Sequence, residues 1–355
     1  MTTTLAAPGR RHAVAHRLRV ARVDRVTAGA VTITFDVPAH LADDYSWQPG
    51  QHVSITGADG TRRSFSICAV PGNPLRVGVR RIPGGAFSDV GVANLVVGDE
   101  LEVLTPTGRF TADPDPTLTR HHVAVSVGSG ITPVLPIVHA LLAGEPGSRV
   151  TWLLGNRTAA EVMLLDEVAA LKDRWPDRLH LVHVLSGEDL GTPLLHGRLD
   201  VDRIGALLDG TGAPAVDDWW VCGPQQLVTA LAQWVDSRGG RFHSELFHAD
   251  DGPVRPRRVA PVEAGATVRV RCDGRTSTAP LGTGQSILDA ASVVRPDLPF
   301  ACRGGVCGTC RARLVTGEVD RGATWALEAD ELDAGYLLTC QAVPTSPDVL
   351  VDYDG

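Results

Sequence analysis

Lysine is almost absent from this chain. Of its 33 lysine and arginine residues only Lys172 is a lysine, so arginine supplies nearly all of the positive charge. Aspartate and glutamate together number 41, and the formal net charge of −8 argues against nucleic acid as the partner. We attribute the shortage of lysine to a compositional habit of the source, and it does not by itself indicate a phosphate site.

Long apolar runs are also missing. No stretch approaches the roughly 18–20 apolar residues that a membrane-spanning helix needs. The first residues include arginines and histidines but no apolar run of about seven, so we do not expect a secretory signal. Cysteine is scarce and odd in number, at seven in 355 residues. These features favour a cytoplasmic protein with a metal centre over a disulfide-stapled secreted one.

Four of the seven cysteines belong to one pattern. Three stand close together as C-x4-C-x2-C, and the fourth follows after 29 intervening residues: Cys302, Cys307, Cys310 and Cys340. This is the plant-type spacing of a [2Fe–2S] cluster, in which four thiolates converge on two irons. The loop also contains glycines that permit tight wrapping around a cluster: Gly304, Gly305 and Gly308.

Zinc and unligated cysteines both fit this pattern less well. Structural zinc sites usually combine C-x2-C with a second such pair or with histidines, whereas here the second half is a lone cysteine. Free core cysteines would be poorly placed in so glycine-rich a loop. The sequence therefore favours iron and sulfur.

The chain divides by pattern into three parts and a linker. Residues 12–116 are strand-rich, with a turn signal about every 8–12 residues, which predicts an antiparallel β-barrel. Residues 117–247 alternate strands and helices, which predicts an α/β domain with a parallel sheet. Clustered proline, glycine and charge predict a linker at 248–263. Residues 264–355 contain the cysteine loop.

The expected elements of the α/β part are a strand, glycine loop and helix over 121–144, a strand and turn over 149–158, a helix at 161–175, a strand at 179–186, and a strand and helix over 218–239. The last part should begin with two strands, 266–272 and 275–281, joined by an Asp273–Gly274 turn. A helix should follow, with Ser286 as its N-cap.

Residues of about 264–355 resemble a plant-type ferredoxin of the β-grasp fold. From Glu318 onward this part is strongly acidic, with Arg321 as its one base. The acids are either an ordinary solvated surface or a docking face for a protein electron acceptor. The sequence does not decide between the two.

The turn V-G-S-G-I-T-P joins a predicted strand to a predicted helix. Gly128 and Gly130 would let backbone amides approach a pyrophosphate at the helix N-terminus. This motif is weak alone, because glycine-rich turns of this kind occur in many folds.

Taken together, the motifs resemble those of the ferredoxin–NADP reductase superfamily. Arg63-Ser64-Phe65-Ser66 is similar to the flavin signature R-x-Y-S, with phenylalanine in the place of tyrosine. The resemblance implies that Arg63 pairs with the flavin phosphate, that Phe65 packs on the isoalloxazine and that Ser66 hydrogen-bonds near flavin N5. The missing tyrosine hydroxyl puts its usual ribityl contact in doubt.

Four further motifs follow in the order of that superfamily. The second flavin motif, whose amides and serine would hold the pyrophosphate, is Gly84, Gly85, Ala86, Phe87 and Ser88. The pyridine-nucleotide motif includes Gly128, Gly130, Thr132 and Pro133. The motif that places a cysteine beside the nicotinamide is Cys222, Gly223 and Pro224. The ending Glu245-Leu246-Phe247 provides the aromatic that would cover the flavin. Singly, Phe65, Phe247 and Cys222 could be core residues and Glu245 a surface acid.

The three parts follow one another as a barrel, a nucleotide domain and a C-terminal ferredoxin. This order resembles that of reductases that supply electrons to oxygenases. Stretches such as "PLLHGRLD" and "YLLTCQAVPTSPDVLVDYD" resemble the reductase subunits of phenylacetyl-CoA epoxidases over nearly the whole chain. The resemblance implies FAD, a nicotinamide donor and a multi-subunit di-iron oxygenase as acceptor, docking at the ferredoxin part. Phthalate dioxygenase reductases share the order but bind FMN; the G-G-A-F-S stretch favours FAD.

We expect hydride transfer to FAD and then single-electron steps through the cluster, with Ser66, Cys222 and Glu245 as catalytic residues. After the second strand of the α/β part come Asn156, Arg157 and Thr158, where an NAD site usually offers a carboxylate. A guanidinium and a hydroxyl suit a 2′-phosphate, so NADPH is favoured, although Arg157 could be a solvated surface residue.

Two other functions remain in competition. One is a reductase for another oxygenase, such as a ring hydroxylase. The other is a non-enzymatic redox sensor, for which no output module is visible.

Overall fold

The computed structural model describes residues 12–210, 215–247 and 265–355. These form two compact units, one of residues 16–247 and the other of residues 12–15 with 265–355. The linker predicted at 248–263 lies outside the described residues. Among the helices that are described, none has the length and apolar character to cross a membrane.

The first part of the larger unit is a six-stranded sheet in the order β4-β3-β6-β1-β2-β5. Its strands are β1 (Ala15–Thr27), β2 (Ala30–Asp36), β3 (His52–Thr56), β4 (Arg62–Ser66), β5 (Arg76–Arg80) and β6 (Glu100–Leu104). The two edges meet where Ile67 bridges Val77 and the Cys68 amide donates to Arg76 O at 2.9 Å. The sheet therefore closes, and alternating apolar residues such as Ile33 and Val77 fill its interior.

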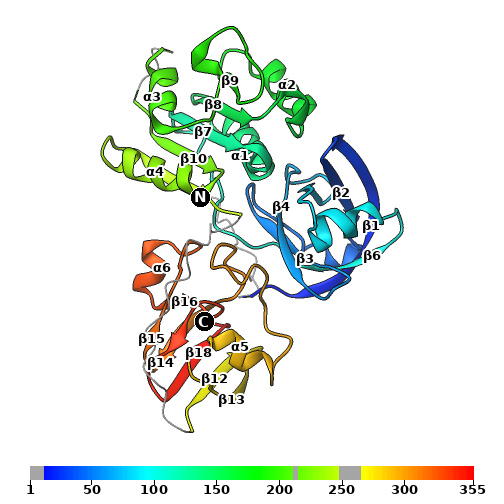
Figure 1. The fold of residues 1–355 in the computed structure, drawn as a ribbon, viewed down its shortest axis with the longest axis vertical. Helices are drawn as coiled ribbons and strands as arrows, with labels where there is room; N and C mark the ends of the chain where they lie inside the picture. The colour runs from blue at the N-terminus through cyan, green and yellow to red at the C-terminus, as the bar shows by residue number, and fades with distance from the viewer. Residues whose placement is uncertain (1–11, 211–214, 248–264) are drawn as a thin grey trace. The chain divides into compact units, whose positions relative to one another are not determined.

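The second part is a five-stranded parallel sheet in the order β11-β10-β7-β8-β9. Its strands are β7 (His121–Val127), β8 (Arg149–Asn156), β9 (Leu179–Leu185), β10 (Asp218–Cys222) and β11 (Arg241–Glu245). Its helices are α1 (Ile131–Gly144), α2 (Leu165–Arg174), α3 (Val201–Gly210) and α4 (Gln225–Asp236). Figure 1 shows α1 and α2 on one side of this sheet and α3 and α4 on the other. The strand order reverses after β9, which puts nucleotide-binding loops at the carboxyl ends of β7 and β10.

Helix α2 is shorter than the predicted 161–175. A single 3₁₀ turn occupies Ala159–Glu161, and Leu164 takes a left-handed conformation (φ 56°) before the helix starts at Leu165. At its other end Lys172 Nζ donates to the carbonyls of Pro176 and Leu179, both at 2.7 Å. The one lysine of the chain therefore fixes the end of a helix to the start of the next strand.

A buried ionic network stabilises the parallel sheet. His122 and Glu145 are both fully buried, and His122 Nε2 lies 2.8 Å from Glu145 Oε2. Asp218 pairs with Arg241 at 2.7 Å and with His243 at 3.2 Å. Burial works against ionisation of Asp218, but these partners outweigh it and lower its pKa to about 2.

The smaller unit is built on a five-stranded sheet in the order β13-β12-β18-β14-β16. Its strands are β12 (Thr267–Cys272), β13 (Arg275–Pro280), β14 (Arg311–Thr316), β16 (Tyr336–Leu338) and β18 (Asp348–Asp352), with β15 (Val319–Asp320) and β17 (Val343–Pro344) forming a separate pair. Strand β12 runs antiparallel to β13 and parallel to β18, and α5 (Ile287–Ser292) packs on β12 and β13. A short helix α6 (Ala329–Asp333) precedes β16. The hydroxyl of Ser286 accepts from the Asp289 amide at 3.1 Å, so the predicted N-cap is confirmed.

Candidate functional site: a flavin and nucleotide cleft and a cysteine loop

The ends of β4 and β11 bring together two of the predicted catalytic residues. Ser66 Oγ donates to Glu245 Oε2 at 2.9 Å, and His52 Nδ1 lies 3.4 Å from Glu245 Oε1. The side chain of Glu245 is only 10% exposed. The sequence placed Ser66 and Glu245 near one reaction centre; it did not single out His52, which β3 places beside them.

Cys222 lies at the carboxyl end of β10, paired in register with Glu245 on β11. It is 1% exposed, and a Cβ on Gly130 would lie 2.2 Å from its carbonyl oxygen. Glycine is thus required at position 130 for the loop after β7 to pass this close to Cys222. Burial, reinforced by the charge of Glu245, raises the pKa of Cys222 well above its usual range. The thiol is therefore neutral at physiological pH.

The flavin signature occupies β4. Phe65 packs on Phe87, with ring centroids 5.2 Å apart and planes at 39°. Arg63 is exposed, and its Nη1 contacts only the neighbouring carbonyl of Arg62 among the hydrogen bonds of the described residues. Along this strand the aromatic ring of Phe65 therefore lies between the cationic side chain of Arg63 and the hydroxyl group of Ser66. This arrangement matches the polarity of a flavin from phosphate to ring.

The second flavin motif forms a wide helical turn, Ala86–Gly91. Ser88 Oγ accepts from the Ile82 amide at 3.3 Å, and Asp89 accepts from the Gly84 amide at 2.9 Å and from Arg81 at 2.5 Å. Arg81, followed by that amide, lowers the pKa of Asp89. The turn gathers amide and hydroxyl groups as an anion site requires, but it also contains a carboxylate that sequence reasoning overlooked.

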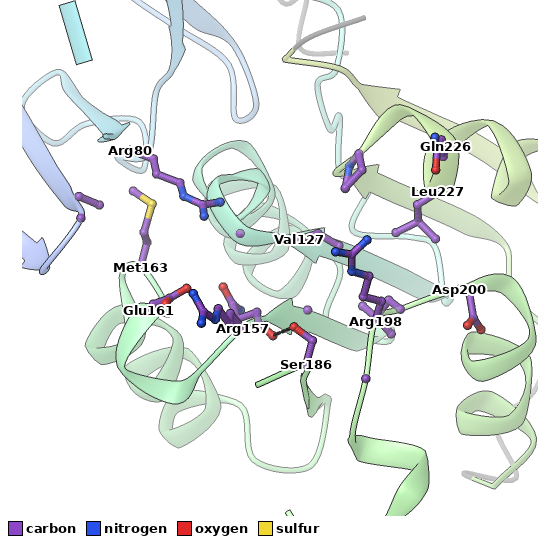
Figure 2. A pocket seen from close by; sticks show the side chains of 18 of the residues that line it. Arg80, Val127, Arg157, Glu161, Met163, Ser186, Arg198, Asp200, Gln226 and Leu227 are labelled. Carbon is purple, nitrogen blue, oxygen red and sulfur yellow. Dashed lines mark hydrogen bonds between the residues drawn. The ribbon is translucent and has the colours of Figure 1, made fainter. Parts of the chain in front are cut away.

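A cavity of about 1140 Å³ lies over the carboxyl ends of β7, β8 and β10. Figure 2 shows Arg80, Arg157 and Arg198 around it, from the barrel, the loop after β8 and the loop before α3. The same cavity is lined by the carboxylates of Glu161, Asp200 and Asp202, but none of them forms an ion pair with these three guanidinium groups in the described part of the chain. Unpaired cations around a cavity of this size suit a polyanionic ligand such as a dinucleotide.

The predicted nucleotide residues divide into two groups. Those that line the cavity are Gly128, Asn156, Arg157 and Pro224. Those that do not line it are Gly130, Thr132, Pro133, Thr158, Cys222 and Gly223. Thr132 is instead 2% exposed and donates to Ser129 O at 2.9 Å, where it packs against Gly78 of the barrel.

Sequence reasoning missed Arg80, Ser186 and Arg198. A Cβ on Gly128, whose φ is +56°, would lie 2.7 Å from Arg80 Nη1, so the barrel arginine lies directly over the glycine turn. Ser186 follows β9 and its Oγ is 3.5 Å from Asn156 O. The sequence did offer a signal for Arg198. This residue follows Gly197 in a Gly-Arg pair shortly before helix α3, and sequence reasoning overlooked that helix as well.

The cysteine loop wraps as predicted, but through partly different residues. Gly305 and Gly308 have φ of +76° and +69°, and a Cβ on Gly305 would meet Ala323 O at 2.8 Å. Gly304 has no positive φ; Arg303 adopts the left-handed conformation instead, at φ 54°. Its guanidinium pairs with Asp289 at 2.6 Å, which holds the loop in place.

The four cysteines lie together around this loop, and none forms a disulfide. A hydrogen bond from Cys307 lowers the pKa of Cys302 to about 6, helped by the Gly304 amide 3.4 Å from Cys302 Sγ. The hydrogen bond between Cys310 and Cys340 raises the pKa of the first and lowers that of the second. Four converging sulfurs, two of them with a lowered pKa, fit a cluster of two irons.

The acids after Glu318 do not form one surface. Glu331 is 3% exposed, pairs with Arg311 and completes a capping box with Glu328. Three more acids interact with the strands of the five-stranded sheet. Asp348 forms an ion pair with Arg269, Asp352 forms one with Arg271, and Asp354 accepts hydrogen bonds from the backbone amides of the β12–β13 turn. Glu331 is therefore not part of the predicted docking face, because its buried carboxylate connects α6 to β14.

Two protein-family models match this chain. Residues 125–233 match the oxidoreductase NAD-binding domain, and residues 270–345 match the 2Fe-2S iron-sulfur cluster binding domain. One subunit of the 1,2-phenylacetyl-CoA epoxidase of Escherichia coli (strain K12) is 39% identical over 353 residues, which cover 96% of this chain and 98% of the relative. The chain belongs to the ferredoxin reductase family.

Further comparisons agree with this family. The ferredoxin reductase component of the 3-ketosteroid-9-alpha-monooxygenase of Rhodococcus rhodochrous is 29% identical over 99% of this reductase and 100% of the relative. The solved structure of phthalate dioxygenase reductase, described as a modular structure for electron transfer from pyridine nucleotides to [2Fe-2S], superposes with a TM-score of 0.58 at 21% identity. The match covers 95% of this chain and 98% of that one, and it confirms the predicted fold class.

This ferredoxin reductase is accordingly an oxidoreductase of the pyridine nucleotide, FAD and [2Fe–2S] class, and its curated relatives are reductase components of oxygenases. Its residues fit these groups. The cavity with its glycine turn fits a dinucleotide, the β4 face fits a flavin, and the loop with four thiols fits a cluster.

Proposed function

We propose that this reductase takes electrons from NADPH and delivers them, through FAD and a [2Fe–2S] cluster, to a di-iron oxygenase, the phenylacetyl-CoA epoxidase of phenylacetate degradation. The strongest support is the 39% identity to the epoxidase component over nearly the full length of both chains. FAD, when bound, would supply the chemistry that connects a two-electron donor to a one-electron cluster. The predicted boundaries of 12–116, 117–247 and 264–355 for the flavin, nucleotide and ferredoxin domains are part of this proposal.

Ser66, Cys222 and Glu245 would surround the contact between nicotinamide and flavin. The Ser66–Glu245 hydrogen bond at 2.9 Å holds the hydroxyl and the carboxylate in one orientation. Glu245 is shielded from water and would place a carboxylate beside the reacting rings. The neutral Cys222 provides a small, uncharged contact for the nicotinamide. Phe247, partly buried against the core, would have to move aside to admit it.

The flavin would be held by Arg63 at its phosphate, by Phe65 and Ser66 at its ring, and by the turn at Gly84, Gly85, Ala86, Phe87 and Ser88. The sulfurs of Cys302, Cys307, Cys310 and Cys340 would ligate the two irons. Both assignments rest on the geometry described above together with the motifs.

The donor proposed is NADPH. Arg157 and Arg198 face the cavity at the ends of β8 and of the loop before α3, and neither has an ion-pair partner among the described residues. A 2′-phosphate would neutralise them and could accept from Ser186 and Asn156 as well. Gly128, Gly130, Thr132, Pro133, Thr158, Gly223 and Pro224 would shape the loops around the rest of the nucleotide.

The oxygenase would dock at the ferredoxin unit around Trp325. This side chain is 50% exposed in the segment 323–326, whose Ala326 amide donates to Gly305 O of the cysteine loop at 3.1 Å. Exposed acids follow it, namely Glu328, Asp330 and Asp333. A tryptophan with acids beside it suits a partner with an apolar pocket and a basic rim.

A reductase for another oxygenase is the second candidate. It is favoured by the 29% identity to the ketosteroid monooxygenase component over the whole length of both chains. A cytoplasmic location is consistent with both candidates, because all seven cysteines are free.

Reconstitution separates the candidates. The purified chain, with NADPH, is mixed with the oxygenase components of phenylacetyl-CoA epoxidase and, in parallel, with a ketosteroid monooxygenase or a ring-hydroxylating dioxygenase. Product formation only with the epoxidase supports the proposal, and product formation only with another oxygenase contradicts it. Cytochrome c reduction by NADPH is the control for a working electron path; its absence would favour a sensor.

Trp325→Ala tests the docking site. We expect transfer to the oxygenase to require about 30-fold more partner, while cytochrome c reduction is unchanged. Val315→Ala is the matched control, because this 48%-exposed valine lies on β14 about 16 Å along the strand from Cys310. Equal effects of the two substitutions would argue against a site at Trp325.

A further inference from the structure

Four groups capable of binding a metal meet at one end of the smaller unit, in addition to the cysteine loop. They come from three segments: His12 from the N-terminal stretch, Cys272 and Asp273 from the β12–β13 turn, and Asp354 after β18. The ligand atoms of His12, Cys272 and Asp273 lie within 4.8 Å of one another. Neither the family's electron path nor the flavin site uses them.

Three of these groups have ligand atoms close enough to share one ion, and Asp354 lies beside His12; the distances fall on both sides of those in a tetrahedral zinc site. His12 Nε2 lies 3.6 Å from Cys272 Sγ, 3.1 Å from Asp273 Oδ1 and 3.6 Å from Asp354 Oδ1. Cys272 Sγ lies 3.9 Å from Asp273 Oδ2. Zinc bonds of about 2.0–2.3 Å at tetrahedral angles put neighbouring ligand atoms roughly 3.3–3.6 Å apart.

Hydrogen bonds with neighbouring backbone groups orient His12 and Asp354, as they orient the ligands in known metal sites. His12 Nδ1 lies 3.3 Å from the Ala13 carbonyl, and Nε2 faces the sulfur and the carboxylates. Asp354 is held by the amides of Asp273 and Gly274, at 2.9 and 2.8 Å. Hydrogen bonds from a ligand histidine to a carbonyl, and to a ligand carboxylate from amides, are characteristic of metal sites.

These groups are mostly anionic or neutral, and one cation lies beside them, because Arg295 Nη1 donates to the Cys272 carbonyl at 3.4 Å. One nitrogen lone pair, one thiol and two carboxylates face each other, with His12 11% exposed and Cys272 1% exposed. A proton on Nε2 would satisfy the carboxylates but would not use the sulfur. A divalent ion that accepts sulfur, nitrogen and oxygen would use all four, and among common ions zinc accepts this set in tetrahedral geometry.

We propose that His12, Cys272, Asp273 and Asp354 bind one zinc ion, which ties the N-terminal stretch to the turn and the C-terminal end of the ferredoxin unit. The site is structural, because all four positions are filled by protein and none is left for substrate. It is separate from the proposed electron path and does not depend on the identity of the oxygenase.

Metal analysis of the intact holoprotein tests the site. The chain is given one equivalent of ZnCl₂ and passed through gel filtration with a weak chelator, and zinc and iron are then measured together. We expect about one zinc beside two irons in the wild type, falling at least tenfold in His12→Ala and in Cys272→Ala with iron unchanged. Zinc X-ray absorption, which iron does not disturb, should give one sulfur at about 2.3 Å and nitrogen or oxygen at about 2.0 Å.

Matched controls come from the same chain. His16→Ala removes a histidine that lies 3.4 Å from Asp44, and Cys68→Ala removes a buried thiol of the barrel. Both should retain zinc, and zinc should raise the thermal midpoint of the controls and of the wild type but not of His12→Ala. The proposal is overturned if the wild type retains no more zinc than His12→Ala, or if the zinc lacks a sulfur ligand. A protonated His12 without metal would give the first of these results.

Discussion

Ser66 and Glu245 are 179 residues apart in the sequence, yet their side chains share a 2.9 Å hydrogen bond. One belongs to the end of a barrel strand and the other to the last strand of the parallel sheet. The contact therefore joins the flavin half and the nucleotide half of the larger unit at the place where hydride transfer would occur.

Glu245→Gln should lower the rate of flavin reduction by NADPH by about 10²-fold, because the neutral amide removes the carboxylate charge from beside the reacting rings. Ser66 can still donate to the amide oxygen, so bound flavin should stay near one per chain. Stopped-flow absorbance measures the rate, and Glu100→Gln, at an exposed acid that pairs with Arg17, is the control. Equal rates in wild type and Glu245→Gln would remove Glu245 from the catalytic set.

Arg157→Ala and Arg198→Ala should each raise KM for NADPH about 10- to 100-fold and leave KM for NADH nearly unchanged. The reason is that a charge-assisted hydrogen bond to a 2′-phosphate contributes about 1.5–3 kcal/mol. Steady-state kinetics with both nucleotides measure the ratio. Arg149→Ala, at an exposed position on the opposite end of β8, is the control. Equal losses with both nucleotides would contradict the 2′-phosphate assignment.

Gly305→Ala should prevent full cluster loading. Alanine at φ +76° costs about 1–2 kcal/mol, and its Cβ would lie 2.8 Å from Ala323 O. Iron per chain and the visible absorbance of the purified protein measure loading. Gly304→Ala is a matched control one residue away, since its Cβ would meet nothing closer than 3.8 Å. Full iron content in Gly305→Ala would show that the loop tolerates the side chain.

The folded state of the nucleotide half should lose stability in acid through Asp218. Its folded pKa of about 2 is below the ordinary value of 3.8, so its contribution is complete above about pH 4 and is lost as the pH falls toward 2. The difference amounts to about 2 kcal/mol of unfolding free energy.

Urea unfolding followed by tryptophan fluorescence at pH 5 and pH 3 measures that contribution. Asp218→Asn should be destabilised at pH 5 and show a weaker fall toward pH 3 than the wild type. Asp348→Asn, which breaks an exposed pair with Arg269, should cost no more than about 1 kcal/mol. A wild type and an Asp218→Asn variant with parallel pH profiles would refute the role of this carboxylate.

Local patterns predicted most of the fold. The Asp273–Gly274 turn, the Ser286 cap and four of the five strands of the parallel sheet follow from short-range rules, whereas β11 was not predicted. Helix α3 was overlooked, and α2 starts later than predicted because Leu164 adopts a left-handed conformation. A backbone choice of that kind depends on packing against the rest of the sheet, which periodicity does not report.

The candidate site was predictable where its residues form motifs, and only there. His52, Arg80 and Arg198 reach the cleft because strands distant in sequence end beside it, and no spacing rule connects them. Glu331 shows the opposite error: a run of acids predicts a surface, yet the ion pair with Arg311 buries this one.

The cap made by Lys172 has a practical consequence. Reagents that acylate primary amines find a single lysine side chain in this protein, and its nitrogen is already bound to two carbonyl oxygens. Its rate of acylation would therefore report how often the last turn of α2 opens, as an intrinsic probe that needs no engineered label.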